Sequence, residues 1–211
     1  MKKPQKHDLR KPEYSAEPEP ALWKDCRNRS RIENVKLEKE ALDDIEADTF
    51  SECILDRITL GETAKGILFA DVLFDHCDLS NAVLDDAVFR RCSFRSCRML
   101  GTSLIRSTFT DVTLEQCGAS YANFNQTEWK HAEWNGVSFE EAALAGCRFQ
   151  DVELHDCDFT GCDFLDTPLA GMDFSDSVLQ KIMVRPQDLN GAVFSWEQAT
   201  LCAELLGVTI K

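Results

Sequence analysis

The sequence lacks the features of a membrane-spanning or secreted chain. It has no apolar run near the roughly 18 residues that a transmembrane helix needs. Lys2, Lys3 and Lys6 lie near its start but are not followed by the hydrophobic stretch of a secretory signal. Proline is scarce as well, and four of the six prolines fall within residues 1–33. We therefore expect a soluble protein of the cytoplasm.

Residue patterns typical of catalysis or of metal and cofactor binding are also missing. The four histidines are scattered, and the glycines occur singly, so neither a nucleophile–base pair nor a phosphate-binding loop is indicated. Several glycines, such as Gly101 and Gly136, instead suit the corners of a repeated unit, where unusual φ angles are needed. We expect no enzyme activity, no metal and no cofactor.

The charge of the chain restricts its partners. Its formal net charge is −14 at pH 7, so the phosphates of nucleic acid would be repelled. We therefore expect no direct nucleic-acid partner. A protein with a basic surface is the partner class that the charge favours.

What the sequence does contain is a strict period of five. From Phe69 onward every phenylalanine falls on the same residue class modulo five, and the 23 consecutive positions of that class from Phe69 to Leu179 are all apolar. The position two residues before each of these centres is nearly always small. This small position includes eight of the ten cysteines, namely Cys53, Cys77, Cys92, Cys97, Cys117, Cys147, Cys157 and Cys162.

A period of five fits neither a helix nor a plain strand, and it requires a turn after every few residues. One large and one small inward side chain in each unit indicate a solenoid, in which short segments stack because no unit can bury its face alone. The segments CDLSNAVLDDAVFRRCSFRS (77–96) and CDFTGCDFLD (157–166) resemble the pentapeptide-repeat family. The resemblance implies an all-β solenoid, namely a right-handed quadrilateral β-helix with four repeats in each 20-residue coil.

The pattern divides the chain into four parts. Residues 1–33 are charged, proline-rich and without the repeat, so we expect a flexible tail whose Trp23 docks on another part of the chain. Residues 34–66 should form irregular N-terminal coils, because Phe50, Leu55 and Leu60 keep the period but lie one residue out of phase. Residues 61–67 should absorb that slip. Residues 67–194 form the main β-helix, and residues 195–211 form its C-terminal end.

This C-terminal end is predicted to be a helix. Ser195 and Gln198 match a capping box, and Gly207 provides a stop. An α-helix here would cover the last coil, as a solenoid requires. The tail resembles the closing helix of many pentapeptide-repeat proteins, which in the quinolone-resistance (Qnr-type) members also forms a homodimer. The residues that this resemblance assigns to the cap and the dimer contact are Trp196, Leu201, Leu205 and Leu206.

Two features of the core leave alternatives. Cys77, Cys97 and Cys117 are 20 residues apart, so they should stack in one column at about 4.8 Å, a spacing that permits a disulfide but that a reducing compartment disfavours. Trp129 and Trp134 occupy two consecutive centres, for which indole is large. They indicate either a locally bulged core or a partly exposed binding edge.

The charges of neighbouring coils follow two different patterns. Asp71, Arg91 and Asp111 should alternate in sign along one column, as should Asp86 and Arg106, and such ladders are structural. By contrast, like charges facing each other across strands are destabilising, so a row of carboxylates indicates either a binding surface or an acidic surface that only confers solubility. The candidate binding residues are the stacked carboxylates and two flanking ones, namely Glu133, Glu153, Asp156, Asp173 and Asp176.

Two functions remain open from the sequence. Qnr-type members bind bacterial type II topoisomerases as rods that imitate DNA, and the resemblance implies a similar role here, with DNA gyrase or topoisomerase IV as partner and reduced fluoroquinolone susceptibility as the result. Six to seven coils give an acidic rod roughly 30 Å long. However, five arginines between Arg90 and Arg106 interrupt the acidic surface. The alternative is a structural adaptor for another protein.

Overall fold

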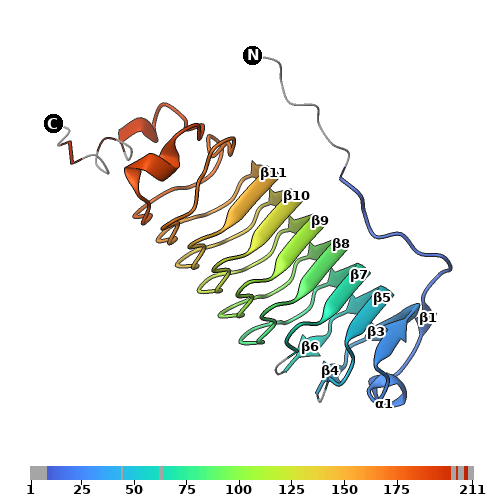
Figure 1. Ribbon diagram of the computed structural model, residues 1–211. Helices are drawn as coiled ribbons and strands as arrows, with labels where there is room; N and C mark the ends of the chain where they lie inside the picture. The colour runs from blue at the N-terminus through green and yellow to red at the C-terminus, as the bar shows by residue number, and fades with distance from the viewer. Residues whose placement is uncertain (1–8, 44, 62–63, 201–202, 204–206, 209–211) are drawn as a thin grey trace.

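The computed structural model describes residues 9–43, 45–61, 64–200, 203 and 207–208, and its coils form a straight rod (Figure 1). Phe69 pairs with Phe89, and Phe89 pairs with Phe109, so each coil of the main run advances the chain by 20 residues. All the pairings are parallel, which is the pattern of a solenoid. Among the described residues, no helix is long and apolar enough to cross a membrane.

Six strands of eight residues form a ladder along one side of the rod, in the order β5-β7-β8-β9-β10-β11 (Figure 1). Shorter elements extend this ladder at the N-terminal end, and a 3₁₀-helix follows the last coil. The strands of the ladder are β5 (Thr49–Asp56), β7 (Leu68–Asp75), β8 (Val88–Arg95), β9 (Thr108–Glu115), β10 (Glu128–Asn135) and β11 (Arg148–His155). The shorter elements are β1 (Glu19–Pro20), α1 (Trp23–Cys26), β2 (Arg31–Glu33), β3 (Val35–Glu38), β4 (Ala41–Leu42), β6 (Thr59–Leu60) and η1 (Pro186–Leu189).

Each coil has four faces, one for each repeat of five residues. In the coil that begins at Ile67, the centres of faces 1 to 4 are Phe69, Phe74, Leu79 and Leu84. The last residue of each repeat forms a corner with positive φ, between 53° and 60° at Asp71, His76, Asn81 and Asp86. Aspartate, asparagine and glycine tolerate this left-handed region best. The predicted corner glycines, including Gly101 and Gly136, also have positive φ.

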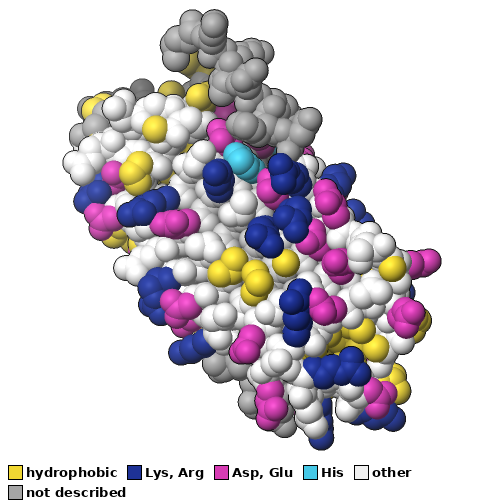
Figure 2. All heavy atoms as spheres, turned by 45° about the vertical axis from the view of Figure 1, so that its right-hand side comes forward, with side chains coloured by type: hydrophobic (Ala, Val, Ile, Leu, Met, Phe, Trp, Pro, Cys, Tyr) yellow, Lys and Arg dark blue, Asp and Glu magenta, His cyan; other side chains and the backbone are white. Residues whose placement is uncertain are grey.

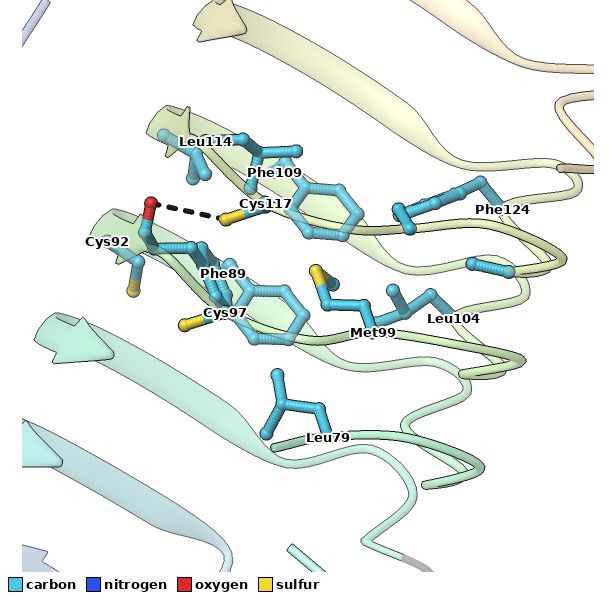
Figure 3. Packing of buried hydrophobic residues seen from close by; sticks show 14 of the residues in the cluster. Leu79, Phe89, Cys92, Cys97, Met99, Leu104, Phe109, Leu114, Cys117 and Phe124 are labelled. Carbon is cyan, nitrogen blue, oxygen red and sulfur yellow. Dashed lines mark hydrogen bonds between the residues drawn. The ribbon is translucent and has the colours of Figure 1, made fainter. Parts of the chain in front are cut away.

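The centres and the small positions together fill the interior. Phe69, Phe89 and Phe109 stack face to face, with ring centroids 5.1 and 4.8 Å apart. Figure 3 shows Phe89 and Phe109 in this column. Trp129 continues this column, with its ring 3.7 Å from that of Phe109 and nearly parallel to it. Stacking between neighbouring coils therefore adds to the packing of the phenylalanines, whose shared phase places them at inward centres.

The structure decides both open questions about the core. Trp129 and Trp134 are 1% and 0% exposed, so they belong to the core, and the interpretation as an exposed binding edge is wrong. The nine described cysteines are buried free thiols, and Cys97 lies between Cys77 and Cys117 in successive coils, because the N–H of Arg98 bonds to the carbonyl of Cys77 and the N–H of Gly118 bonds to that of Cys97. The predicted sulfur column is therefore present without a disulfide among the described residues, and Figure 3 shows Cys97 and Cys117 within it.

The predicted phase slip is present at the N-terminal end of the rod. Phe50 pairs with Phe69, a step of 19 residues instead of 20. The backbone N–H of Leu60 bonds to the carbonyl of Asp78, and that of Ala64 bonds to the carbonyl of Val83. Four residues of the lower coil therefore match five residues of the coil above, so the lower coil is one residue shorter between Leu60 and Ala64. The slip thus lies within the predicted segment. Below it, β2 and β3 pair with β5 and form the additional coil that was expected.

Residues 19–33 belong to the folded body, although the sequence predicted a tail for residues 1–33. β1 pairs with β3, and β2 pairs with β5. Trp23 does dock, as expected: its ring is 6% exposed, lies 6.4 Å from Phe50 and donates a hydrogen bond from Nε1 to the carbonyl of Asp43. The indole closes the N-terminal end of the aromatic column, which would otherwise contact water. A repeat search cannot find such a cap, because a cap is used once.

The C-terminal end has the predicted capping box. The Ser195 N–H donates to Gln198 Oε1 at 2.7 Å, and the Gln198 N–H donates to Ser195 Oγ at 3.3 Å. Ala199, Thr200 and Ala203 are helical. The Gln198 amide also donates to the carbonyls of Phe174 and Ser177, so one side chain both starts the helix and holds it on the last coil.

Candidate functional site

The candidate site lies on the outward side of face 2, where one column of side chains follows the rod. Residues of this column precede the face 2 centres and therefore point away from the core. Strand pairing brings Glu133 directly beside Glu153, as predicted. From the N-terminal end the paired column reads Ile54, Leu73, Ser93, Thr113, Glu133 and Glu153, so it changes from apolar to hydroxyl-bearing to acidic.

Asp173 continues the column beyond the last strand. It forms a parallel bridge with Val193 and is exposed, as the sequence indicated. Its Oδ1 accepts the N–H of Ser175 at 3.0 Å, which fixes the direction of the carboxylate. No described strand pair joins Asp173 to Glu153, so the three predicted carboxylates form one confirmed pair and a third member in the same repeat position.

The flanking carboxylates lie at the corner that follows face 2. Asp156 has φ of 50°, and both Asp156 and Asp176 are exposed. Asp176 Oδ2 lies 3.5 Å from Nδ1 of His155, which carries charge only when protonated. Among the described residues, no lysine, arginine or histidine lies within 4.0 Å of Asp156 or Asp173. We call the five residues Glu133, Glu153, Asp156, Asp173 and Asp176 the acidic surface.

Three of the five arginines in the arginine-rich band pair with carboxylates of neighbouring coils. Arg91 binds Asp71, Arg106 binds Asp86 at 2.7 Å, and Arg95 lies 3.4 Å from Glu115. Two of these pairs are the predicted ladders, and the third was not predicted. Figure 2 shows basic and acidic side chains interspersed over one face of the rod. The band therefore interrupts the acidic character of the rod less than its sequence suggested.

One charged arrangement was missed by the sequence analysis. His131 lies at the corner between faces 1 and 2, with Nδ1 3.5 Å from Asp111 and Nε2 3.5 Å from Asp151. The predicted column of Asp71, Arg91 and Asp111 thus extends over two further coils. The signal was present in the spacing of 20 residues, but it becomes visible only when histidine is counted as a cation. Among the described residues, no group of three His, Cys, Asp or Glu side chains has the arrangement of a metal site.

The residues predicted for the cap and dimer contact lie at the C-terminal end. Trp196 is 86% exposed. Three further apolar residues before it, Val178, Met183 and Val193, are also exposed at the C-terminal end of the rod. Leu201, Leu205 and Leu206 lie outside the described residues.

Comparison with known proteins identifies the repeat. The profile described as "Pentapeptide repeat region" matches residues 67–143, and that described as "Pentapeptide repeats (8 copies)" matches residues 138–176. Together they span just over half of the chain. No curated protein sequence matches the chain.

Solved structures with similar coils share little sequence with this chain. QnrB1, a plasmid-mediated fluoroquinolone resistance protein, is 16% identical over 85% of this chain and 99% of its own, with a TM-score of 0.36. HetL, which is involved in heterocyst differentiation regulation in the cyanobacterium Nostoc, is 16% identical over 77% of this chain and 86% of its own, with a TM-score of 0.43. A pentapeptide repeat protein of the Arabidopsis thaliana thylakoid lumen is 22% identical over 49% of this chain and 65% of its own, with a TM-score of 0.32.

With identities below 25%, these likenesses concern the fold alone. The period of five, the four corners in each coil and the two matching profiles lead to one conclusion. The chain belongs to the pentapeptide-repeat family, whose fold is the right-handed β-helix.

Proposed function

We propose that the chain is a non-catalytic binding rod whose acidic surface binds a basic protein surface in the cytoplasm. The observation that carries the proposal is the register of Glu133 and Glu153. Side-by-side carboxylates oppose folding, and the repeat places no requirement on this outward position, which holds Ser93 and Thr113 in earlier coils. A basic partner surface would bind this row of carboxylates through complementary charge.

The DNA-binding groove of a type II topoisomerase is the partner surface that we propose. The chain is an acidic rod with a net charge of −14, and pairing of the arginine band with Asp71, Asp86 and Glu115 reduces the positive interruption along it. A groove built for duplex phosphates attracts such a rod by the same long-range electrostatics. The consequence would be inhibition of DNA gyrase or topoisomerase IV, or protection from fluoroquinolones. A homodimer formed through the C-terminal end belongs to the same proposal and would double the length of the rod.

A supercoiling assay with purified gyrase, with and without ciprofloxacin, tests the proposal. The wild-type protein should inhibit supercoiling or protect the enzyme from the drug. The triple variant Glu153→Lys, Asp173→Lys, Asp176→Lys should lose that effect, because it reverses the charge of the acidic surface.

The matched control reverses three carboxylates outside the acidic surface, Glu46→Lys, Glu140→Lys and Glu141→Lys. All three are exposed, so the change in net charge is the same. If both triple variants lose the effect equally, net charge and not the acidic surface is responsible. If folded wild-type protein has no effect at tens of micromolar, the topoisomerase proposal is wrong.

A structural adaptor is the second candidate, and the charge distribution favours it. The coil of β8 carries the exposed Arg90 and Arg98, for which no carboxylate lies within 4.0 Å among the described residues, whereas the acidic surface begins at β10, so the rod presents two different surfaces along one axis. Two partners of opposite charge would then bind at the two places. A pull-down with the acidic-surface triple variant as bait, compared with wild type, distinguishes a partner of that surface from a partner of the arginines.

A further inference from the structure

The N-terminal segment lies along the corner between faces 1 and 2 in the first coils of the rod. Residues 9–18, here called the strap, precede β1 and run back beside the strands (Figure 1). The N–H of Glu13 donates to Asp71 Oδ1 at 3.1 Å, and the N–H and hydroxyl of Ser15 both donate to Glu52. The strap is therefore bound through its backbone, by carboxylates on two neighbouring coils.

The surface beneath the strap differs from the same positions elsewhere on the rod. Ala70 is 6% exposed, although it occupies the outward position that Lys130 holds as an exposed residue on β10. Ser93 is 4% exposed, whereas Glu153 of the same column is exposed. These coils thus present small and apolar side chains where other coils present charges. The difference matches a surface built to be covered by a peptide.

The carboxylates that hold the strap also need a donor. Glu52 and Asp71 occupy the same corner in successive coils, both with positive φ, so two like charges are neighbours. Arg91 neutralises Asp71 from the other side. The N–H groups of the strap supply the hydrogen bonds on the Glu52 side, as the N–H groups of any extended chain would.

The central side chain of the strap gives the site its selectivity. Tyr14 is half-buried, and burial raises its pKa to about 12, with Cys53, Cys92 and Asp71 contributing in the same direction. An aromatic ring between two backbone-bonded residues is a typical anchor of peptide recognition. The prolines at 12 and 18 preset an extended backbone, which lowers the entropy lost when the strap binds.

The strap is held much more weakly than the coils. Upstream of β1 the strap is joined to the rod by hydrogen bonds from Glu13 and Ser15 to carboxylate side chains, and the described residues 9–18 form no strand ladder with the rod. A segment with so few buried contacts opens at a small fraction of the global free energy of unfolding. A competing peptide can therefore replace it while the rod stays folded.

We propose that this corner of coils β5 to β8 is a peptide-binding surface and that the strap is its built-in competitor. The partner is a protein segment with the chemistry of the strap: extended, containing proline, with an aromatic residue followed by a hydroxyl-bearing residue. The site lies on the apolar part of the face 2 column and does not depend on the acidic surface or its partner.

Full-length Ser15→Asp is the variant that opens the site, because it places a carboxylate against Glu52. Ser15→Thr keeps the hydroxyl and is the matched control. The probe is a fluorescent peptide of residues 9–20, and a second peptide carries Tyr14→Ala. We expect the first peptide to bind Ser15→Asp at least tenfold more tightly than it binds wild type or Ser15→Thr. The Tyr14→Ala peptide should bind at least tenfold more weakly.

Amide hydrogen exchange reports the state of the strap in the same samples. In Ser15→Asp the amides of residues 13 and 15 should exchange at least tenfold faster than in wild type, while those of β7 and β8 stay unchanged. If the strap is released and the peptide does not bind, the surface has no peptide specificity. If the strap stays protected, it is a permanent part of the fold. Either result overturns the proposal.

Discussion

The guanidinium of Arg91 donates two hydrogen bonds to the carboxylate of Asp71, which lies 20 residues earlier at the same corner of the previous coil. The side chains are only 21% and 10% exposed, whereas those of the second such pair, Arg106 and Asp86, are 53% and 48% exposed. Water therefore screens the second pair far more than the first.

This contrast predicts unequal losses of stability. Arg91→Ala should lower the free energy of unfolding by about 1–2 kcal/mol, because it leaves a buried carboxylate without its partner. Arg106→Ala should cause a clearly smaller loss. Urea denaturation of both variants measures the difference, and equal losses would show that burial does not control the strength of these ladders.

The aromatic column predicts that a charge at one centre unfolds its neighbours. Phe159 is fully buried and stacks on Phe139 at 5.3 Å. Phe159→Asp should cost at least about 4 kcal/mol, since it removes a large ring and buries a charge. Hydrogen exchange should show the loss spreading to adjacent coils.

Two comparison variants belong to this prediction. Phe159→Leu keeps an apolar side chain and should remain folded. Asp173→Lys lies on the surface and should change the free energy of unfolding by less than about 1 kcal/mol. Unfolding of the Asp173→Lys variant would contradict the position of that residue on the rod.

The two core tryptophans predict losses of stability of different size when each is replaced by phenylalanine. Trp129 Nε1 donates to Thr127 Oγ1 at 3.0 Å, but Trp134 Nε1 has no acceptor among the described residues. Trp129→Phe should therefore cost about 2 kcal/mol, while Trp134→Phe should cost less than about 1 kcal/mol, because it also removes a buried unsatisfied donor. Thermal unfolding of the two variants checks the order, and a larger loss for Trp134→Phe would contradict it.

The buried cysteines should be inert in the native state. Burial raises the pKa of Cys92 to about 12 and those of Cys53, Cys147 and Cys157 to about 11, so these four residues carry almost no thiolate at pH 8. The neighbouring Cys97 lowers the pKa of Cys77 and Cys117, but both are buried, so a reagent reaches them only when the coils open. In a Cys202→Ala variant, which removes the one cysteine outside the described residues, a thiol reagent should label no cysteine within an hour. Full labelling in 6 M guanidinium provides the reference. Rapid native labelling would mean that the coils open readily.

Gln198 predicts how the C-terminal end is held. Its Oε1 accepts the Ser195 N–H, and its Nε2 donates to two carbonyls of the last coil. Gln198→Glu keeps the capping acceptor but loses the donor, whereas Gln198→Ala loses both. Faster amide exchange in residues 172–178 of both variants would show that the donor matters. An effect confined to Gln198→Ala would assign the role to the capping box alone.

Much of the rod could be predicted because its structure repeats. The inward positions, the corner glycines, the sulfur column and the slip near residues 61–67 follow from a period that every coil must obey. The alternating ladder of Asp71 and Arg91 follows from the same register. The stack of Glu133 and Glu153 does too, because residues 20 apart can only be neighbours in such a solenoid.

Features that occur once could not be found in this way. Trp23 caps the aromatic column, the strap binds Glu52 and Asp71, and His131 bridges two coils. The sequence by itself determined which side chains point inwards, since burial of one large and one small residue in each repeat is a local requirement. Only the tertiary structure decided what covers the ends and the first corner, because those contacts join segments with no shared period and depend on shape, hydrogen bonding and charge in three dimensions.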